Sequence, residues 1–441
     1  MSAPLPAHRL FFPLGAGFAA LSVPAWVGMR AGLLPPVGST PVVWHGHEML
    51  FGFAGAAMAG FLVTHTSRPL LSALLGAWLA ARAASVLGGW WSYLALPFAL
   101  LFAAITAPAF LRRAKAWSNA PFVLVPAGLL VAELAFGLEQ SGIVEADGRA
   151  LLLASDGVLL LLVVMGGRIT RTSTAGLARS HRQTIGSLGR GLESLSALLL
   201  LAHAALALSG GPSSLSGFCS LAAGGIGLLR LARWWTGAIV HAPEVAGLHL
   251  GCLWLGLGLV LAGLGEAGLA PDPSTGLHAA VVGGLGSLAF AVFVRTTLQR
   301  ERLPIEAGRR ICRLLPFLSL AACFRIAADL LPEPLHLPAL AASASSWSAA
   351  FGSLALWLLV GPVGRRGRTR SASAALPGAG MTDGRATRGP RPRARGRRRQ
   401  SAGVAALGAP RRRGWSRRHK GAEEARHGLA AGLSGRRDEP Y

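Results

Sequence analysis

The chain has 441 residues, of which 52% are apolar and only 14% are charged. Soluble domains carry about 25% charged residues, so this composition excludes a soluble body of two or three domains, whose surface would lack polar cover. A net charge of +24 would suit a nucleic-acid-binding protein, but residues 361–441 hold 21 Lys and Arg against 5 Asp and Glu, whereas residues 1–360 hold 22 against 14. We therefore divide the chain into an apolar body, 1–360, and a basic tail, 361–441.

Twelve segments of the body are apolar and long enough to cross a bilayer as helices, which takes about 20 residues each. They are residues 10–29, 46–66, 70–88, 90–111, 120–139, 150–168, 191–210, 214–232, 246–265, 277–296, 311–331 and 338–360. Close helix contacts are predicted at the glycines of the second and tenth segments, namely Gly52, Gly55, Gly60, Gly283, Gly284 and Gly286. The sequence predicts an all-α polytopic membrane protein with about 12 transmembrane helices.

The basic residues of the body alternate between successive loops. The loops after even-numbered spans contain 16 Lys and Arg, counting residues at the span ends, whereas the loops after odd-numbered spans contain only Arg30 and Arg149. Lys and Arg accumulate in cytoplasmic loops. Both termini are therefore predicted to be cytoplasmic, and odd-numbered spans run outward.

Ionisable residues within the spans are candidates for function, because they are costly to place in lipid. With this orientation most of them lie toward the outer side, namely His45, His47, Glu48, Arg82, Glu133, Asp156, His203, His278, Arg325 and Asp329. A smaller inner set contains His65, Glu193 and His249. The polar residues thus predict an outer layer and a smaller inner group.

Several of these residues also have a purely structural interpretation. Arg82 could form an ion pair with Glu133 or Asp156, and Arg325 lies four residues from Asp329 on one helix face. His203 is interpreted as a hydrogen-bonded packing residue. Six further histidines lie in loops or termini and are predicted to be solvated: His8, His181, His241, His336, His419 and His427.

Two imidazoles and a carboxylate are close together in Trp44-His45-Gly46-His47-Glu48-Met49, at the start of the second span. Imidazole binds iron, copper and zinc. Residues two apart on a regular helix point about 200° apart, so His45 and His47 share one metal only if the helix is irregular there. Otherwise they serve different ligands, or one supports the other. An interfacial tryptophan belt with hydrogen-bonded histidines is the structural alternative.

Two more histidines, His249 and His278, lie in otherwise apolar helices and are further ligand candidates. A haem needs one or two axial ligands and basic partners for its propionates, and Arg82 and Arg325 lie at a suitable depth for the second role. The four cysteines form no CxxC pair and are interpreted as small apolar residues. The sequence contains no P-loop, dinucleotide fingerprint, GxSxG or HExxH motif, so it identifies no reaction.

The body resembles the NnrS family of polytopic membrane proteins over roughly residues 8–360. The resemblance rests on His-Arg-Leu-Phe-Phe-Pro (8–13), the run from Trp44 to Ala56, Ala-Gly-Phe-Leu-Val-Thr (59–64), Met-Gly-Gly-Arg-Ile (165–169), Leu-His-Leu-Gly-Cys-Leu-Trp (248–254) and Leu-His-Ala-Ala-Val-Val-Gly-Gly-Leu-Gly (277–286). It implies haem and copper as cofactors, a bacterial inner membrane, and a role in denitrification and resistance to nitric oxide.

Carried over by position, the resemblance implies metal or haem ligands at His45, His47, His249 and His278. From their own positions in the sequence, five residues are candidates for supporting, propionate-binding or ion-pair roles, namely Glu48, Arg82, Asp156, Arg168 and Arg325, and His65 and His203 are weaker candidates. Two stretches depart from the family pattern. Thr170 to Thr174 replace an apolar Pro-Phe-Phe-Thr stretch, and Leu298-Gln299-Arg300 stand where the family has a Gly-His pair. If that imidazole is a ligand, this chain binds one metal fewer or binds it differently.

The depths of the histidines lead to a hypothesis of two sites. His249 and His278 are predicted near opposite faces of a bilayer about 30 Å thick, so they cannot share one iron. We expect an outer site with His45 or His47 and His278, and an inner site around His249 and His65.

The sequence leaves three alternative functions open. The first is a haem and copper protein that handles nitric oxide or protects against it, with a quinone or another redox partner if it is redox-active. The second is a transporter of a small anion or metal complex, bound by Arg82 and Arg325. The third is a non-catalytic scaffold or assembly factor.

The tail is rich in Arg, Gly, Ala and Pro and cannot bury enough apolar surface to fold. It is interpreted as a polybasic segment on an anionic leaflet or as an out-of-frame extension of the coding sequence. Nucleic-acid binding is not expected, because only Trp415 interrupts its basic runs.

Overall fold

A computed structural model describes residues 6–361 except 39, 65, 112–120, 146, 187–189 and 271. The chain divides into two units, Met1–Pro377 and Gly378–Tyr441, and every described residue belongs to the first. His65 and the predicted tail beyond Gly361 therefore lie outside the described residues. The described residues form helices and no strand, which confirms the all-α prediction.

The helices follow one another in a single series. In chain order they are α1 (His8–Arg30), α2 (Pro41–His47), η1 (Glu48–Ala54), α3 (Gly55–Leu62), α4 (Arg68–Leu87), η2 (Gly89–Ala95), α5 (Leu96–Leu111), α6 (Pro121–Gln140), α7 (Arg149–Leu161), η4 (Leu162–Gly166), α8 (Gly167–Ser180), α9 (Arg190–Ser209), α10 (Ser213–Trp234), η5 (Gly237–His241), α11 (Pro243–Glu266), α12 (Pro273–His278), η6 (Ala279–Leu285), α13 (Gly286–Arg300), η7 (Ile305–Gly308), α14 (Arg309–Cys312), α15 (Pro316–Leu330) and α16 (Glu333–Val360). Here η1, η4 and η6 are π-helical, and η2, η5 and η7 are 3₁₀-helical.

Within the described part of the chain, 11 helical segments are long and apolar enough to cross a membrane. The remaining predicted span corresponds to the continuous helical run Pro41–Leu62, formed by α2, η1 and α3. Its first turns carry the polar residues His45, His47 and Glu48, which lower its mean hydropathy. The polytopic membrane architecture is confirmed, whereas the sidedness of the termini stays a prediction.

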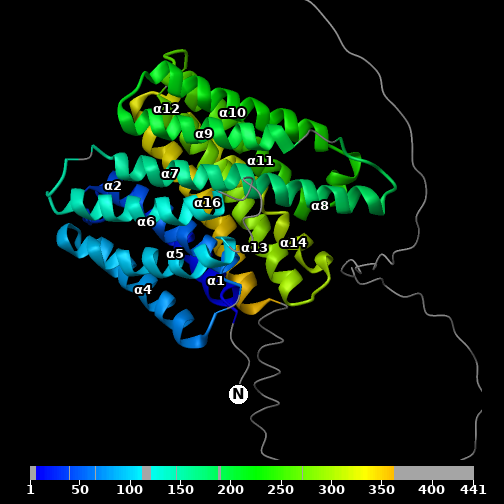
Figure 1. The fold of residues 1–441 in the computed structure, drawn as a ribbon, viewed down its shortest axis with the longest axis horizontal. Coiled ribbons are helices and arrows are strands. Elements are labelled where there is room, and N and C mark those ends of the chain that lie inside the picture. Colours follow the sequence, from blue (N-terminus) through cyan, green and yellow to red (C-terminus); the bar gives the residue numbers. More distant parts are fainter. Residues whose placement is uncertain are drawn as a thin grey trace, which may run out of the picture. The chain divides into compact units, whose positions relative to one another are not determined.

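Six helices lie side by side in the order α10, α9, α7, α6, α5 and α4, each packed against the next (Figure 1). α11 packs on α10 and also on α12, η6 and α13. α1 packs along α16, and α15 packs on α16. The fully buried phenylalanines come from α1, η1, α13 and α16 and include Phe11, Phe12, Phe53, Phe290, Phe293 and Phe351. The first and last described helices therefore help to enclose the same core.

Glycines allow the closest helix approaches, as predicted from their number. A Cβ atom built on Gly224 of α10 would lie 2.7 Å from the Gly256 carbonyl oxygen of α11, and one on Gly217 would lie 2.6 Å from that of Gly263. A Cβ on Gly52 in η1 would lie 2.6 Å from the Phe18 ring. Small residues at such contacts let helix backbones pack tightly in a membrane.

Three π-helical segments interrupt the bundle. π-Helices are rare in proteins and often occur at functional sites. η1 begins directly after His47, and η6 begins directly after His278, while η4 lies between α7 and α8. Two of the histidine-bearing segments indicated by the sequence thus change from α-helix to π-helix directly after a histidine.

Candidate functional site

Two short helices place His45 and His278 at one end of the bundle. α2 starts with Thr40, whose Oγ1 accepts a hydrogen bond from the Val43 N–H at 3.3 Å. α12 starts with Asp272, whose Oδ1 accepts one from the Ser274 N–H at 2.7 Å. This backbone hydrogen bond holds the pKa of Asp272 below its usual value. Each cap is followed by a proline that is preorganised for the first turn, so both helices have sharply defined starts.

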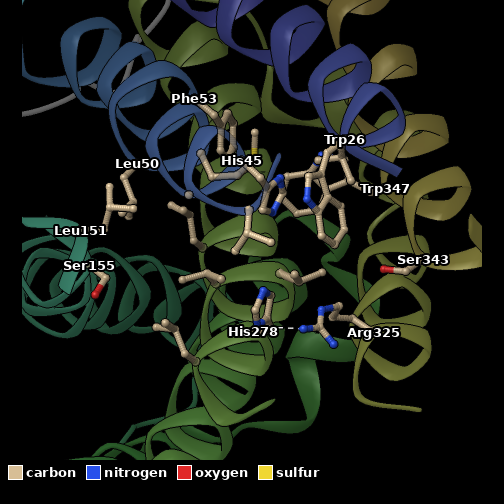
Figure 2. A pocket seen from close by; sticks show the side chains of 18 of the residues that line it. Trp26, His45, Leu50, Phe53, Leu151, Ser155, His278, Arg325, Ser343 and Trp347 are labelled. Atoms are coloured by element: carbon tan, nitrogen blue, oxygen red, sulfur yellow. Dashed lines mark hydrogen bonds between the residues drawn. The ribbon is translucent and has the colours of Figure 1, made fainter. Parts of the chain in front are cut away.

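The two histidines line one cavity of about 270 Å³, which we call the histidine cavity. Its walls come from α1, α2, η1, α7, α12, η6, α15 and α16, and are formed by Val23, Trp26, Val42, His45, Gly46, Met49, Leu50, Phe53, Gly148, Leu151, Leu152, Ser155, Leu277, His278, Val281, Val282, Leu285, Arg325, Leu340, Ser343 and Trp347. Figure 2 shows His45 beside the indoles of Trp26 and Trp347, across the pocket from His278 and Arg325. The lining is apolar apart from a few polar groups, as is usual for sites that bind small molecules or cofactors.

His278 is held by hydrogen bonds that define its tautomer. Its Nδ1 lies 2.7 Å from the Ser274 carbonyl oxygen, and because a carbonyl only accepts, Nδ1 carries the proton and Nε2 has a free lone pair. The guanidinium of Arg325 lies 3.3 Å from the same Nδ1, which in this tautomer cannot accept a hydrogen bond from it, and forms a 2.5 Å ion pair with Asp329, as predicted. Thr275 donates a 2.8 Å hydrogen bond to the same carboxylate. These contacts hold the imidazole of His278 in place on the wall of the cavity.

His45 is held by stacking. Its ring lies 4.4 Å from that of Trp26, centroid to centroid, at an interplanar angle of 25°. Its Nδ1 is buried, and none of the described residues gives it a hydrogen-bond partner. An imidazole nitrogen without a partner beside an apolar cavity is available to a ligand.

His47 lies in a buried polar network outside this cavity. Its Nδ1 is 2.9 Å from Glu48 Oε1, and its Nε2 is 2.9 Å from Glu133 Oε1. Arg82 Nη1 completes the network with a 2.5 Å ion pair to Glu48. The expectation that Arg82 pairs with Glu133 or Asp156 is therefore wrong, because η1 turns Glu48 toward α4. Both nitrogens of His47 face carboxylates, so of the two neighbouring histidines only His45 lines the cavity.

His203 forms a second, partly buried cluster with two carboxylates. Its Nδ1 lies 3.3 Å from Asp156 on α7, and its Nε2 lies 2.9 Å from Glu266 on α11. This confirms the interpretation of His203 as a hydrogen-bonded residue and places Asp156 beside it, away from the histidine cavity. The cluster ties α7, α9 and α11 together.

His249 lies apart from these groups, near the start of α11, and is 5% exposed. Its Nε2 is 2.9 Å from Thr174 Oγ1 on α8, and its Nδ1 has no hydrogen-bond partner among the described residues. Arg168 lies on α8 as well and pairs with Glu193 at 2.6 Å, and Arg230 contacts the same carboxylate at 3.2 Å. His249 and His278 therefore line separate cavities, and the two-site hypothesis of ligation stays a prediction.

Two of the histidines expected to be solvated are not. His8 is only 2% exposed, and its Nε2 lies 3.2 Å from Glu301 Oε1, because the chain packs back on the end of α13 at the first turn of α1. His336 is half-buried, with Nδ1 2.8 Å from the Ala328 carbonyl oxygen. His181 and His241 are exposed as predicted. His419 and His427 lie outside the described residues.

The sequence did not indicate three residues of the cavity. Trp347 lies inside an apolar span, and its Nε1–H donates a 2.9 Å hydrogen bond to the Ala19 carbonyl oxygen. Ser343 is an ordinary small residue of the same span, and Trp26 lies near a span end where a tryptophan is interpreted as interfacial. Residue spacing could not show that these side chains line a cavity, because a helix face that contacts a ligand and one that contacts a neighbouring helix are both apolar.

No group of three or more His, Cys, Asp and Glu side chains in the described part of the chain is arranged to hold a metal ion. A haem needs only one or two protein ligands, so the histidine cavity suits it in the chemistry of its donors. Copper sites in proteins commonly use three or more side chains, and we place none in this structure.

Comparison with known proteins agrees with the sequence motifs. None of the curated proteins compared with the chain matches it. The family model described as NnrS protein matches residues 5–361, which is most of the chain and includes every site described above. The chain therefore belongs to the NnrS protein family.

Proposed function

We propose that this membrane protein binds haem in the histidine cavity, with His278 as an iron ligand, and that it handles nitric oxide or protects a bacterial cytoplasmic membrane against it. The observation that carries the proposal is the meeting of His45 and His278 in one apolar cavity. They lie on α2 and α12, far apart in the sequence, and each has a ring nitrogen that no described residue engages.

His278 has the features of an iron ligand. Histidines that bind metals commonly donate their other ring N–H to a carbonyl or carboxylate, which fixes the tautomer and raises the basicity of the ligating nitrogen. The 2.7 Å hydrogen bond from Nδ1 to the Ser274 carbonyl supplies this support and leaves Nε2 for the iron. Asp272 defines the start of the short helix that carries both residues.

The other walls suit a flat, mostly apolar group. Trp26, Trp347 and Phe53 give the cavity an apolar aromatic lining, and Arg325 offers a cation to a propionate. When bound, haem iron would supply a coordination position for a diatomic gas such as nitric oxide. His45, on the wall opposite His278, would then face the bound group and set the polarity around it (Figure 2).

The alternative of an anion transporter has less support. Of its two predicted anion-binding residues, Arg82 is paired with Glu48, and Arg325 lines the cavity in which we place haem. Arg82 also does not line the histidine cavity, so we do not assign it to a propionate. No contact of the described residues favours a scaffold function.

The test is an optical spectrum of the purified protein with its haem and metal content. We expect a Soret band in the wild type, its loss in His278→Ala, and its retention in His336→Ala, a matched control at a half-buried histidine outside the cavity. His45→Ala should retain haem and alter the spectrum of the nitric oxide complex. A wild type without haem, or a His278→Ala protein with the full band, would contradict the proposal.

A further inference from the structure

A second cavity lies beside His249 and is separate from the histidine cavity. It is a groove of about 910 Å³ between the end of α10, η5, the start of α11 and α14. Apart from His249 and Arg313, its lining is almost entirely apolar and includes Trp235, Pro243, Cys312 and Pro316. This volume lies within the range of small-molecule sites, about 300–1,000 Å³.

The groove opens at the surface of the bundle. Trp235, Val240 and Leu253 line it and are 58%, 64% and 39% exposed, respectively. Leu253 lies within the membrane-spanning helix α11, where an exposed apolar side chain meets acyl chains, whereas Trp235 and Val240 lie in the connection between α10 and α11. A ligand of this groove would therefore enter from the bilayer and would have to be lipophilic.

Hydrogen bonds set the chemical character of His249. The Thr174 hydroxyl donates to the Thr170 carbonyl at 2.7 Å, so its oxygen accepts the hydrogen bond from His249 Nε2–H at 2.9 Å. The proton therefore resides on Nε2, and Nδ1 is an acceptor without a partner among the described residues. A buried acceptor of this kind favours a ligand that carries a hydrogen-bond donor.

We propose that the groove binds the head group of a quinol, an aromatic ring with hydroxyls at opposite positions and an apolar tail. One hydroxyl donates to His249 Nδ1, and the exposed guanidinium of Arg313 offers a donor to the second oxygen. Pro243 and Pro316 provide flat apolar walls for the ring. The proposal concerns binding at this groove and does not depend on haem in the other cavity.

Trp235 lies beside the His249 ring in this groove. Its indole stands edge-on to His249, with the ring centroids 6.1 Å apart and an interplanar angle of 83°. Because Nδ1 is buried, the quinol hydroxyl reaches it only if a neighbouring side chain turns aside, and we assign this movement to the Trp235 indole. Binding should therefore change the fluorescence of Trp235.

The test compares two ligands on the full-length protein in quinone-free phospholipid nanodiscs under anaerobic conditions. One is a decyl-substituted benzoquinol, and the other is its dimethyl ether, which has the same ring and tail but no hydroxyl donors. We expect the wild type to bind the quinol about tenfold more tightly than the ether, because the ether leaves Nδ1 unpaired. Equal binding of the two, or no binding of either, would overturn the proposal, and equal binding would identify an acyl-chain groove.

Variants separate the hydrogen bond from general packing. His249→Leu should bind quinol and ether equally, and Thr174→Val should reduce the preference for the quinol, because the imidazole can then move its proton to Nδ1. His241→Leu, an exposed histidine that does not line the groove, should behave as the wild type. If His249→Leu does not fold, the ligand comparison and Thr174→Val still decide. A preference unchanged in both variants would contradict the role of His249, and the Soret band of His278→Ala tests the haem proposal independently.

Discussion

At the scale of single residues, the surroundings of each histidine decide what it can do. His47 hydrogen-bonds to a carboxylate through each ring nitrogen. His203 hydrogen-bonds to Glu266 through Nε2, and its Nδ1 lies 3.3 Å from Asp156 as an ion-pair partner. His278 and His249 each use one nitrogen for a hydrogen bond and leave the other without a partner in the described structure. The same side chain thus serves as structural support in one place and as a candidate ligand in another.

Arg82→Met tests the network around His47. The substitution leaves Glu48 buried without its cation, which is strongly destabilising, at about 3–5 kcal/mol for a buried pair. We expect a correspondingly lower free energy of unfolding in denaturant titrations of the detergent-solubilised protein.

The control for this prediction is the double variant Arg82→Met/Glu48→Gln. It removes the unpaired charge and keeps a side chain that can hydrogen-bond to His47, so it should regain part of the lost stability. A single variant as stable as the wild type would show that the ion pair contributes little.

At the scale of helices, close packing and irregular turns build the sites. η1 and η6 are π-helical and both contribute walls to the histidine cavity. The Trp78 indole donates a 3.1 Å hydrogen bond to the Gly52 carbonyl within η1, which supports the widened turn. Neither segment can be recognised from apolar composition, because a π-turn and an α-turn bury the same kinds of residue.

Gly224→Ala tests the contact between α10 and α11. The new Cβ atom would lie 2.7 Å from the Gly256 carbonyl oxygen, so the two helices must separate. We expect a loss of about 1–3 kcal/mol in the free energy of unfolding, as for overpacked cores. Gly225→Ala, with no atom within 4 Å of its new Cβ, should be nearly neutral, and an equal loss in both variants would argue against the contact.

At the scale of the whole molecule, residues distant in the sequence close the bundle. Arg9 and His8 at the start of α1 pair with Glu301 after α13. Arg300 donates hydrogen bonds to the carbonyl oxygens of Gly60 at 2.9 Å and Phe61 at 2.7 Å. These contacts join α1, α3 and α13 at the end of the bundle opposite the start of α12.

The Glu301 contacts predict a pH dependence of stability. Burial raises the pKa of Glu301, but the hydrogen bond and the charge of Arg9 outweigh it, so the pKa lies below its usual value in the folded protein. A depressed carboxyl pKa stabilises the fold above the unfolded value of about 4.3, and this stability is lost as pH falls through the folded pKa.

Thermal unfolding of the wild type and Glu301→Gln across pH checks this sign. The wild type should be more stable at neutral pH by about 1 kcal/mol, since the pair is partly exposed, and the difference should shrink below about pH 4. A difference that grows toward acidic pH would contradict the assignment.

Much of the architecture could be predicted from the sequence. Apolar runs and their length define spans because the bilayer has a fixed thickness, and the family motifs indicated the candidate ligands. The ion pair of Arg325 with Asp329 followed from helical periodicity, because both residues lie on one helix. The partner of Arg82 did not, because the helix face on which Glu48 points depends on the π-turn that starts there.

The sequence by itself determined that this is an all-α polytopic membrane protein, because hydropathy acts along one coordinate, the depth in the bilayer, whereas the depths of its polar residues stay a prediction. Only the tertiary structure decided that His45 shares a cavity with His278, that His47 is held by carboxylates, and that His249 lines a largely apolar groove. Lateral neighbours of a helix are not encoded in its own hydropathy, since one apolar face can meet lipid, another helix or a ligand. Which of these it meets depends on the packing of the whole bundle.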